Sequence, residues 1–191
     1  EMTSSLVGSE MCIRDRMNGD YHDVEQWLSD GSCDLGFVAL PTKQRGRVTA
    51  LLEDRLLAVV PRDHRLASLP RFPIKEVEHE PFISLLETSD HDARRALEAA
   101  GVTPNIRYTT KDDYAIIAMV EQGLGVSIMP ELLLSGRSDN VRVMELTPPA
   151  SRTIGLCLPD ADRAGPATLR FADCVSDWVR EHYSRLQNTL S

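Results

Sequence analysis

The 191-residue sequence has none of the short motifs that mark the commonest enzyme and nucleotide-binding sites. It contains no GxGxxG, no GxxxxGK(S/T) phosphate loop, no HExxH and no GxSxG. It also has no secretory signal and no apolar run of about 18 residues, the length that crosses a bilayer. We therefore expect a protein that is not an enzyme, does not contact a membrane and resides in the cytoplasm.

Cysteine is scarce and scattered along the chain. The four cysteines are Cys12, Cys33, Cys157 and Cys174, and none belongs to a CxxC pair or stands at metal-ligand spacing from a histidine. Scattered cysteines with apolar neighbours are typical of reduced thiols packed in a core. The sequence therefore predicts no disulfide framework, no metal and no cofactor.

Basic residues are fewer than acidic ones. The chain has 21 Lys and Arg against 29 Asp and Glu, which gives a formal net charge of −8. Such a surface repels the phosphates of nucleic acids, so these residues alone are poorly suited to bind DNA. Length and composition are those of a globular protein with one sizeable domain or two small ones.

The first sixteen residues differ from the rest of the chain. Residues 4–16 show no helical or strand periodicity, and they resemble the translation of a library adapter. We expect residues 1–16 to be non-native or disordered and exclude them from the fold prediction.

Beyond residue 16, apolar runs alternate with amphipathic segments, which predicts an α/β fold with a doubly wound sheet. The run 34–40 is almost continuously apolar, which is typical of a strand buried on both faces in a parallel sheet. The other predicted strands are 48–52, 56–60, 81–86, 105–109, 126–129 and 152–158. The predicted helices are 22–30, 90–100, 112–122, 130–134 and a long one over 167–182.

Two predicted helix starts in the middle of the chain follow strands directly. Residues 89–92 and 110–113 both fit the S/T-x-x-D/E capping pattern. In open α/β sheets ligands bind outside the carboxyl ends of strands, near free helix N–H groups. Segments 84–89 and 109–113 therefore line a pocket or merely begin two well-capped helices; both interpretations stay open. The connection 123–130 is expected to use glycines at Gly123 and Gly125 for a left-handed turn and a close packing contact.

Four stretches together resemble the effector-binding domain of LysR-type transcriptional regulators. They are Asp34-Leu35-Gly36-Phe37-Val38, the VPxxHxL stretch over 60–66, Glu80-Pro81-Phe82-Ile83, and the VxxGxGVxxxP stretch over 120–130. The resemblance covers residues 17–183. It implies a fold like that of type II periplasmic binding proteins, with two Rossmann-like lobes joined by two crossing strands and a small molecule bound in the cleft between them.

The resemblance also implies a division of the chain and a set of site residues. Lobe one would hold residues 17–60 and 154–185, lobe two residues 61–153, and residues 186–191 would form a C-terminal tail. The hinge would lie at Val60, Pro61, Thr153 and Ile154. The implied ligand-binding residues are Ser84, Leu85, Leu86, Glu87, Ser89, Thr110, Asp112, Asp113, Ile128 and Met129.

By this resemblance, the domain senses a small-molecule effector and controls transcription through a winged helix-turn-helix domain. Only that second domain would bind DNA. The full-length protein would be a homodimer or tetramer. The first strand, first helix and most of the second strand of lobe one are missing from these residues, which would expose a sheet edge. Helix N-termini facing the cleft favour an organic anion as effector. Two alternatives remain: a solute-binding protein of the same fold that serves a transporter, and an enzyme that uses Cys33 or Cys157 in the cleft.

Overall fold

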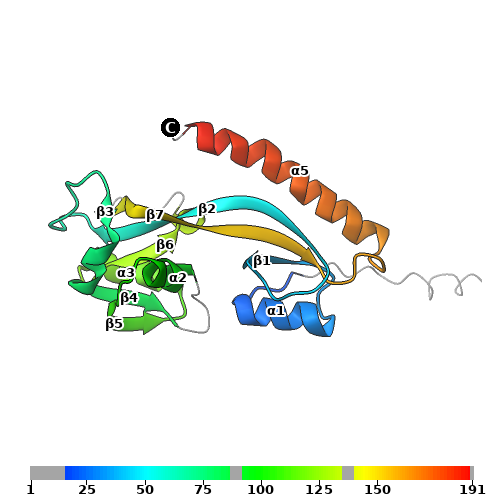
Figure 1. Ribbon diagram of the computed structural model, residues 1–191, viewed down its shortest axis with the longest axis horizontal. Helices are drawn as coiled ribbons and strands as arrows, with labels where there is room; N and C mark the ends of the chain where they lie inside the picture. Colours follow the sequence, from blue (N-terminus) through cyan, green and yellow to red (C-terminus); the bar gives the residue numbers. More distant parts are fainter. Residues whose placement is uncertain (1–15, 87–91, 135–139, 190–191) are drawn as a thin grey trace, which may run out of the picture.

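Two lobes are joined by two long antiparallel strands in the computed structural model, which describes residues 16–86, 92–134 and 140–189 (Figure 1). Strand β2 (Arg47–Pro61) pairs with β7 (Val141–Leu158) along its whole length, from Arg47 opposite Leu158 to Pro61 opposite Val141. Each strand begins in one lobe and ends in the other. The predicted arrangement of two α/β lobes with two crossing strands is confirmed.

Lobe one is a sheet with one helix on each face. Strand β1 (Gly36–Leu40) pairs with the end of β7; α1 (Tyr21–Asp30) and α5 (Pro166–Thr189) complete the lobe. Cys157 packs with Leu28 of α1, whereas its neighbour Leu156 packs with Ala172 of α5. Because successive strand residues point to opposite faces, α1 and α5 cover opposite sides of the sheet, as Figure 1 shows.

Lobe two is built around the other ends of β2 and β7. Its strands are β3 (Phe72–Pro73), β4 (Pro81–Leu85), β5 (Asn105–Thr110) and β6 (Ser127–Pro130); its helices are η1 (Ile74–Glu78), α2 (Asp92–Ala99), α3 (Asp113–Glu121) and α4 (Glu131–Leu134). Strand β6 pairs antiparallel with β2, and β4 pairs parallel with β5. Val60 packs in one core cluster with Phe72 and Phe82, whereas Val59 packs in another with Ile83 and Met129. Lobe two therefore also has a core on each side of its β-sheet layer.

Three sequence predictions are wrong. The run 34–40 does not enter a parallel sheet: β1 is antiparallel to β7, and Phe37 is 49% exposed. Strand β7 enters this lobe from the opposite direction because it returns from lobe two. The separate strands 48–52 and 56–60 are one strand, since buried Asp54 between them is neutralised by Arg152 of β7 and does not interrupt the pairing. Cys174 is exposed rather than packed in the core.

The turn between α3 and β6 places the two glycines as predicted. Gly123 has a positive φ of 70°. Gly125 lies where an added Cβ would come within 2.3 Å of the Pro81 carbonyl oxygen. This close approach lets the Val126 N–H donate to the Pro81 carbonyl at 2.9 Å and the Ile83 N–H donate to the Val126 carbonyl at 2.9 Å. These bonds attach β4 to the chain that leads into β6.

We expect Gly125→Ala to lower the free energy of unfolding by about 1–3 kcal/mol, because the methyl group meets backbone that cannot rotate away. Gly165→Ala is the matched control, since an added Cβ there meets nothing within 4 Å. Urea unfolding followed by circular dichroism measures both. An equal loss in the two variants would contradict the close-packing role of Gly125.

Candidate functional site

A cavity of about 510 Å³ lies between the lobes, beside the crossing strands. On the lobe-one side it is lined by the segment around α1's start, from Asn18 to Asp23. On the lobe-two side it is lined mainly by Leu85, Asp92, Lys111, Asp113, Ile128 and Met129, and Leu56 and Arg152 of the crossing strands complete it. The cavity therefore has an apolar part, formed by the ends of β4 and β6, and a charged part at the strand crossing.

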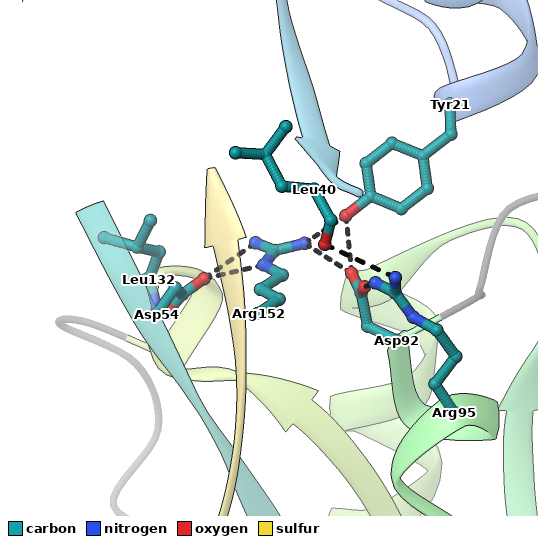
Figure 2. A network of polar contacts seen from close by, with 7 residues as sticks. All are labelled: Tyr21, Leu40, Asp54, Asp92, Arg95, Leu132 and Arg152. Carbon is teal, nitrogen blue, oxygen red and sulfur yellow. Dashed lines mark hydrogen bonds and ion pairs between the residues drawn. The ribbon is translucent and has the colours of Figure 1, made fainter. Parts of the chain in front are cut away.

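The charged part is centred on Arg152, whose side chain is 14% exposed. Its Nε and Nη2 atoms donate to one oxygen of Asp54, at 2.9 and 2.8 Å, across the β2–β7 ladder. The other Asp54 oxygen accepts the N–H of Leu132 at 3.1 Å, at the start of α4 (Figure 2). The buried carboxylate is thus held by a cation and a backbone donor, as buried charges require.

A second carboxylate on the same network belongs to lobe two. Asp92, 4% exposed in the first turn of α2, accepts the Tyr21 hydroxyl at 2.6 Å and lies 3.4 Å from Arg152. Its other oxygen is ion-paired with Arg95, which also reaches the Leu40 carbonyl of β1 at 3.4 Å. Figure 2 shows Tyr21 and Leu40 approaching Asp92 and Arg95 from the opposite lobe.

Burial alters the acid–base properties of this network. It raises the pKa of the Tyr21 hydroxyl well above its usual range, outweighing the opposing effect of Arg152, so the phenol stays protonated and donates at neutral pH. Burial also raises the pKa of Asp54, although Arg152 and the Leu132 N–H act in the other direction.

Four of the predicted ligand-binding residues line the cavity: Leu85, Asp113, Ile128 and Met129. They lie at the end of β4, the start of α3 and in β6. Predicted residues Glu87 and Ser89 lie outside the described residues.

Four others make local contacts and are not among the cavity-lining residues. The Ser84 hydroxyl donates to the Leu85 carbonyl at 2.9 Å, and the Leu86 N–H donates to the Thr110 carbonyl at 2.9 Å. The helix cap of α3 is Asp112 rather than Thr110, since Asp112 accepts the Tyr114 N–H at 2.8 Å. The capping interpretation applies to Asp112, whereas Lys111 and Asp113 beside it line the cavity, so segment 109–113 contributes to both.

The first half of the predicted hinge lies inside lobe two. Val60 is completely buried in a lobe-two core cluster and pairs with Arg142. Pro61 pairs with Val141, at the end of β2 farthest from lobe one.

The second half lies elsewhere, so the structure does not bring the two halves together. Thr153 and Ile154 pair with both β2 and β1, on the lobe-one side of the crossing. Asp54 and Arg152 face each other in the ladder between the two lobes' cores. Hinge motion at any of these positions stays a prediction, as do the lobe boundaries.

Sequence reasoning missed Tyr21, Asp54, Asp92 and Arg152, and it included Lys111 only as part of segment 109–113. One signal was available: Asp54 stands inside an apolar stretch over 48–60, and a carboxylate buried there requires a cation. The partner could not be located, because Arg152 is 98 residues away.

Two kinds of site are not found in the part of the chain that the structure describes. It contains no group of three His, Cys, Asp or Glu side chains placed to hold a metal ion. Its helices also include none that is both long enough and apolar enough to cross a membrane.

Residues 17–180 match the family described as the LysR substrate binding domain. The chain belongs to this family. Among curated proteins, the HTH-type transcriptional regulators YvbU and YwbI of Bacillus subtilis are 27% and 32% identical over 161 and 130 residues. These matches cover 83% and 66% of this chain but 55% and 43% of the relatives, so this LysR substrate-binding domain spans about half the length of the curated relatives it matches.

Solved structures show the same fold. The regulatory domain of Synechocystis CcmR, solved in complex with 2-PG, superimposes with a TM-score of 0.77 at 18% identity, covering 85% of this chain and 81% of that one. The effector binding domain of QuiR, in complex with shikimate, gives 0.75 at 21% identity, covering 86% and 80%. The predicted periplasmic-binding-protein-like fold is confirmed.

We expect Arg152→Met to lower the free energy of unfolding by about 3–5 kcal/mol, because it leaves the Asp54 carboxylate buried without its cation. Asp54→Leu combined with Arg152→Met should recover much of this loss, since no buried charge then remains unpaired. Urea unfolding compares the three proteins. A double variant as unstable as Arg152→Met would contradict the pairing.

The loss caused by Arg152→Met should depend on pH. Without the lowering effect of Arg152, the pKa of Asp54 rises further above its ordinary value. An acid whose pKa is raised by folding destabilises the fold fully above its folded pKa and less as pH falls toward its unfolded value. The difference between variant and parent should therefore be largest near neutral pH and shrink in mildly acidic buffer. A difference that stays constant across this range would contradict the assignment to Asp54.

Proposed function

We propose that this chain is the effector-sensing part of a LysR-type transcriptional regulator and that the interlobe cavity holds the effector. The observation that carries the proposal is the cavity itself, which both lobes line and which combines an apolar wall with buried polar groups, as small-molecule sites do. Family membership and the 2-PG and shikimate complexes of CcmR and QuiR support it.

Binding in this position acts on lobe geometry. A ligand that contacts both walls stabilises the lobe arrangement in which both contacts are made. The curated relatives are named HTH-type regulators, so the full-length protein would carry a helix-turn-helix domain. The preferred lobe arrangement would affect that domain through the contacts of a homodimer or tetramer. The helix-turn-helix domain would make the DNA contacts, since the net charge of −8 disfavours DNA binding by this chain. The regulator would act in the cytoplasm.

For the effector we propose a small organic anion with one acidic group. Lys111, beside the start of α3, is a cation on the cavity wall that can pair with it. Asp20, Asp23 and Asp113 on the same walls disfavour a second negative charge by repulsion. The apolar part formed by Leu85 and Met129 suits the ligand's carbon skeleton.

The alternatives have less support. The curated relatives YvbU, YwbI and YybE are HTH-type transcriptional regulators, which favours a regulator over a transport protein. An enzyme that uses a cleft cysteine is disfavoured, since neither Cys33 nor Cys157 lines the interlobe cavity. Cys157 is buried, and burial raises the pKa of its thiol, which lowers its reactivity at neutral pH.

Titration calorimetry with a library of small monocarboxylates, shikimate included, tests the proposal. We expect one or more ligands to bind and Lys111→Met to weaken their binding about tenfold, the loss of roughly 1.4 kcal/mol from one charge-assisted contact. Lys75→Met is the matched control, because Lys75 is exposed on η1 and does not line the cavity. Equal weakening by both substitutions would place the ligand elsewhere, and no binding in the whole library would rule out this ligand class.

A further inference from the structure

We propose that the hydrogen bond from Tyr21 to Asp92 is a latch that holds the two lobes together and that cavity occupancy acts on it. This inference rests on the proposed function only in its last step, the link to an effector. The latch itself is a property of the chain without ligand.

The latch residues come from opposite lobes. Tyr21 is the first residue of α1 in lobe one, and Asp92 is in the first turn of α2 in lobe two, 71 residues later. Their oxygens are 2.6 Å apart. A second, longer contact follows the same path, since Arg95 of α2 donates to the Leu40 carbonyl of β1 at 3.4 Å. Both contacts must break if α2 moves away from lobe one.

The surroundings make the Tyr21–Asp92 bond strong. Asp92 is 4% exposed, so water does not compete well for its carboxylate. A hydrogen bond to an ionised acceptor in such surroundings is stronger than one between neutral groups. The raised pKa of Tyr21 keeps its proton in place as the donor. Opening the lobes would leave Asp92 without one of its donors, which costs free energy even where water enters.

Arg152 connects the latch to the strand crossing. Its Nη1 atom lies 2.7 Å from the Tyr21 hydroxyl and 3.4 Å from Asp92, while its other nitrogens are held by Asp54. Because β7 fixes Arg152 between the lobes, the guanidinium orients the Tyr21 hydroxyl toward Asp92. The Tyr21 hydroxyl therefore connects α1 to the crossing strands through Arg152 and to α2 through Asp92.

A ligand in the interlobe cavity would contact the latch residues directly. Tyr21, Asp92 and Arg152 all line the interlobe cavity of about 510 Å³. An effector oxygen that accepts from the Arg152 Nη1 atom would compete with the Tyr21 hydroxyl. Effector binding and the lobe arrangement are then thermodynamically linked, and each changes the other by the same factor.

Amide hydrogen exchange of the ligand-free chain tests the latch. Tyr21→Phe removes only the hydroxyl, which donates to Asp92 and accepts from Arg152. We expect it to speed exchange about tenfold in both α1 and α2, because only the Asp92 bond reaches α2 and hydrogen bonds to charged groups are strong. In an Asp92→Ala background, which has already lost the acceptor, the same substitution should change exchange in α2 less than about twofold, while α1 still loses its bond to Arg152. Tyr108→Phe is the matched control, since Tyr108 is an exposed tyrosine of β5 outside the network.

Three results would overturn the latch. Faster exchange in α1 alone would show that Tyr21 anchors only its own helix. An equal effect of Tyr21→Phe on α2 with and without Asp92 would show that the two side chains are not coupled. An unchanged rate in both helices would show that the bond does not hold the lobes.

A milder variant protects the test against misfolding. Arg95 is 40% exposed, so Arg95→Met should fold. It removes the long Leu40 contact and the ion pair that helps to hold Asp92 in the latch, and we expect it to speed exchange in α2 and β1 about threefold. No change in either segment would also overturn the latch. Because no ligand is used, these results are independent of the effector titration.

Discussion

The pairing of β2 with β7 is the interaction on which the rest of the molecule depends. These two strands are the only elements among the described residues that belong to both lobes, and every other described strand except β4 and β5 pairs with one of them. At the middle of the ladder Asp54 faces Arg152, so the sheet carries a buried charge pair where the lobes meet. A buried pair adds little to stability compared with apolar side chains of the same size. Its value at this position is therefore better explained by the orientation that it gives to Tyr21 and Asp92.

Local elements were predictable because their causes are local. The helix α1 follows from the spacing of Val24, Trp27 and Leu28, and it ends at Gly31 with a positive φ of 78°. The same holds for α3 and for the glycine turn that follows it, where close contact with Pro81 excludes a side chain at Gly125. The family resemblance added what local patterns lacked, the two lobes and the two strands that cross between them.

The site was only partly predictable because it depends on residues far apart in the chain. Leu85, Ile128 and Met129 lie at strand ends, where the fold alone directs attention. Tyr21 and Asp92 acquire their role only through each other and through Arg152, across separations of 71 and 60 residues. No periodicity or spacing rule reports a contact of that kind. The predicted parallel pairing of β1 was wrong for a similar reason, since an apolar composition does not show which strand lies beside β1 or in which direction that strand runs.

The position of lobe two between the crossings has a consequence for how the chain folds. Strand β2 is complete at Pro61, but its partner begins only at Val141, so 79 residues separate the two ends that first meet, and more separate every later pair. Closing so large a loop costs conformational entropy before the ladder repays it. We therefore expect the intervening helices and the β4–β5 pair, whose contacts are short-range, to assemble before the ladder closes. The interlobe cavity would then be among the last features to form, and during synthesis it would exist only after β7 has left the ribosome.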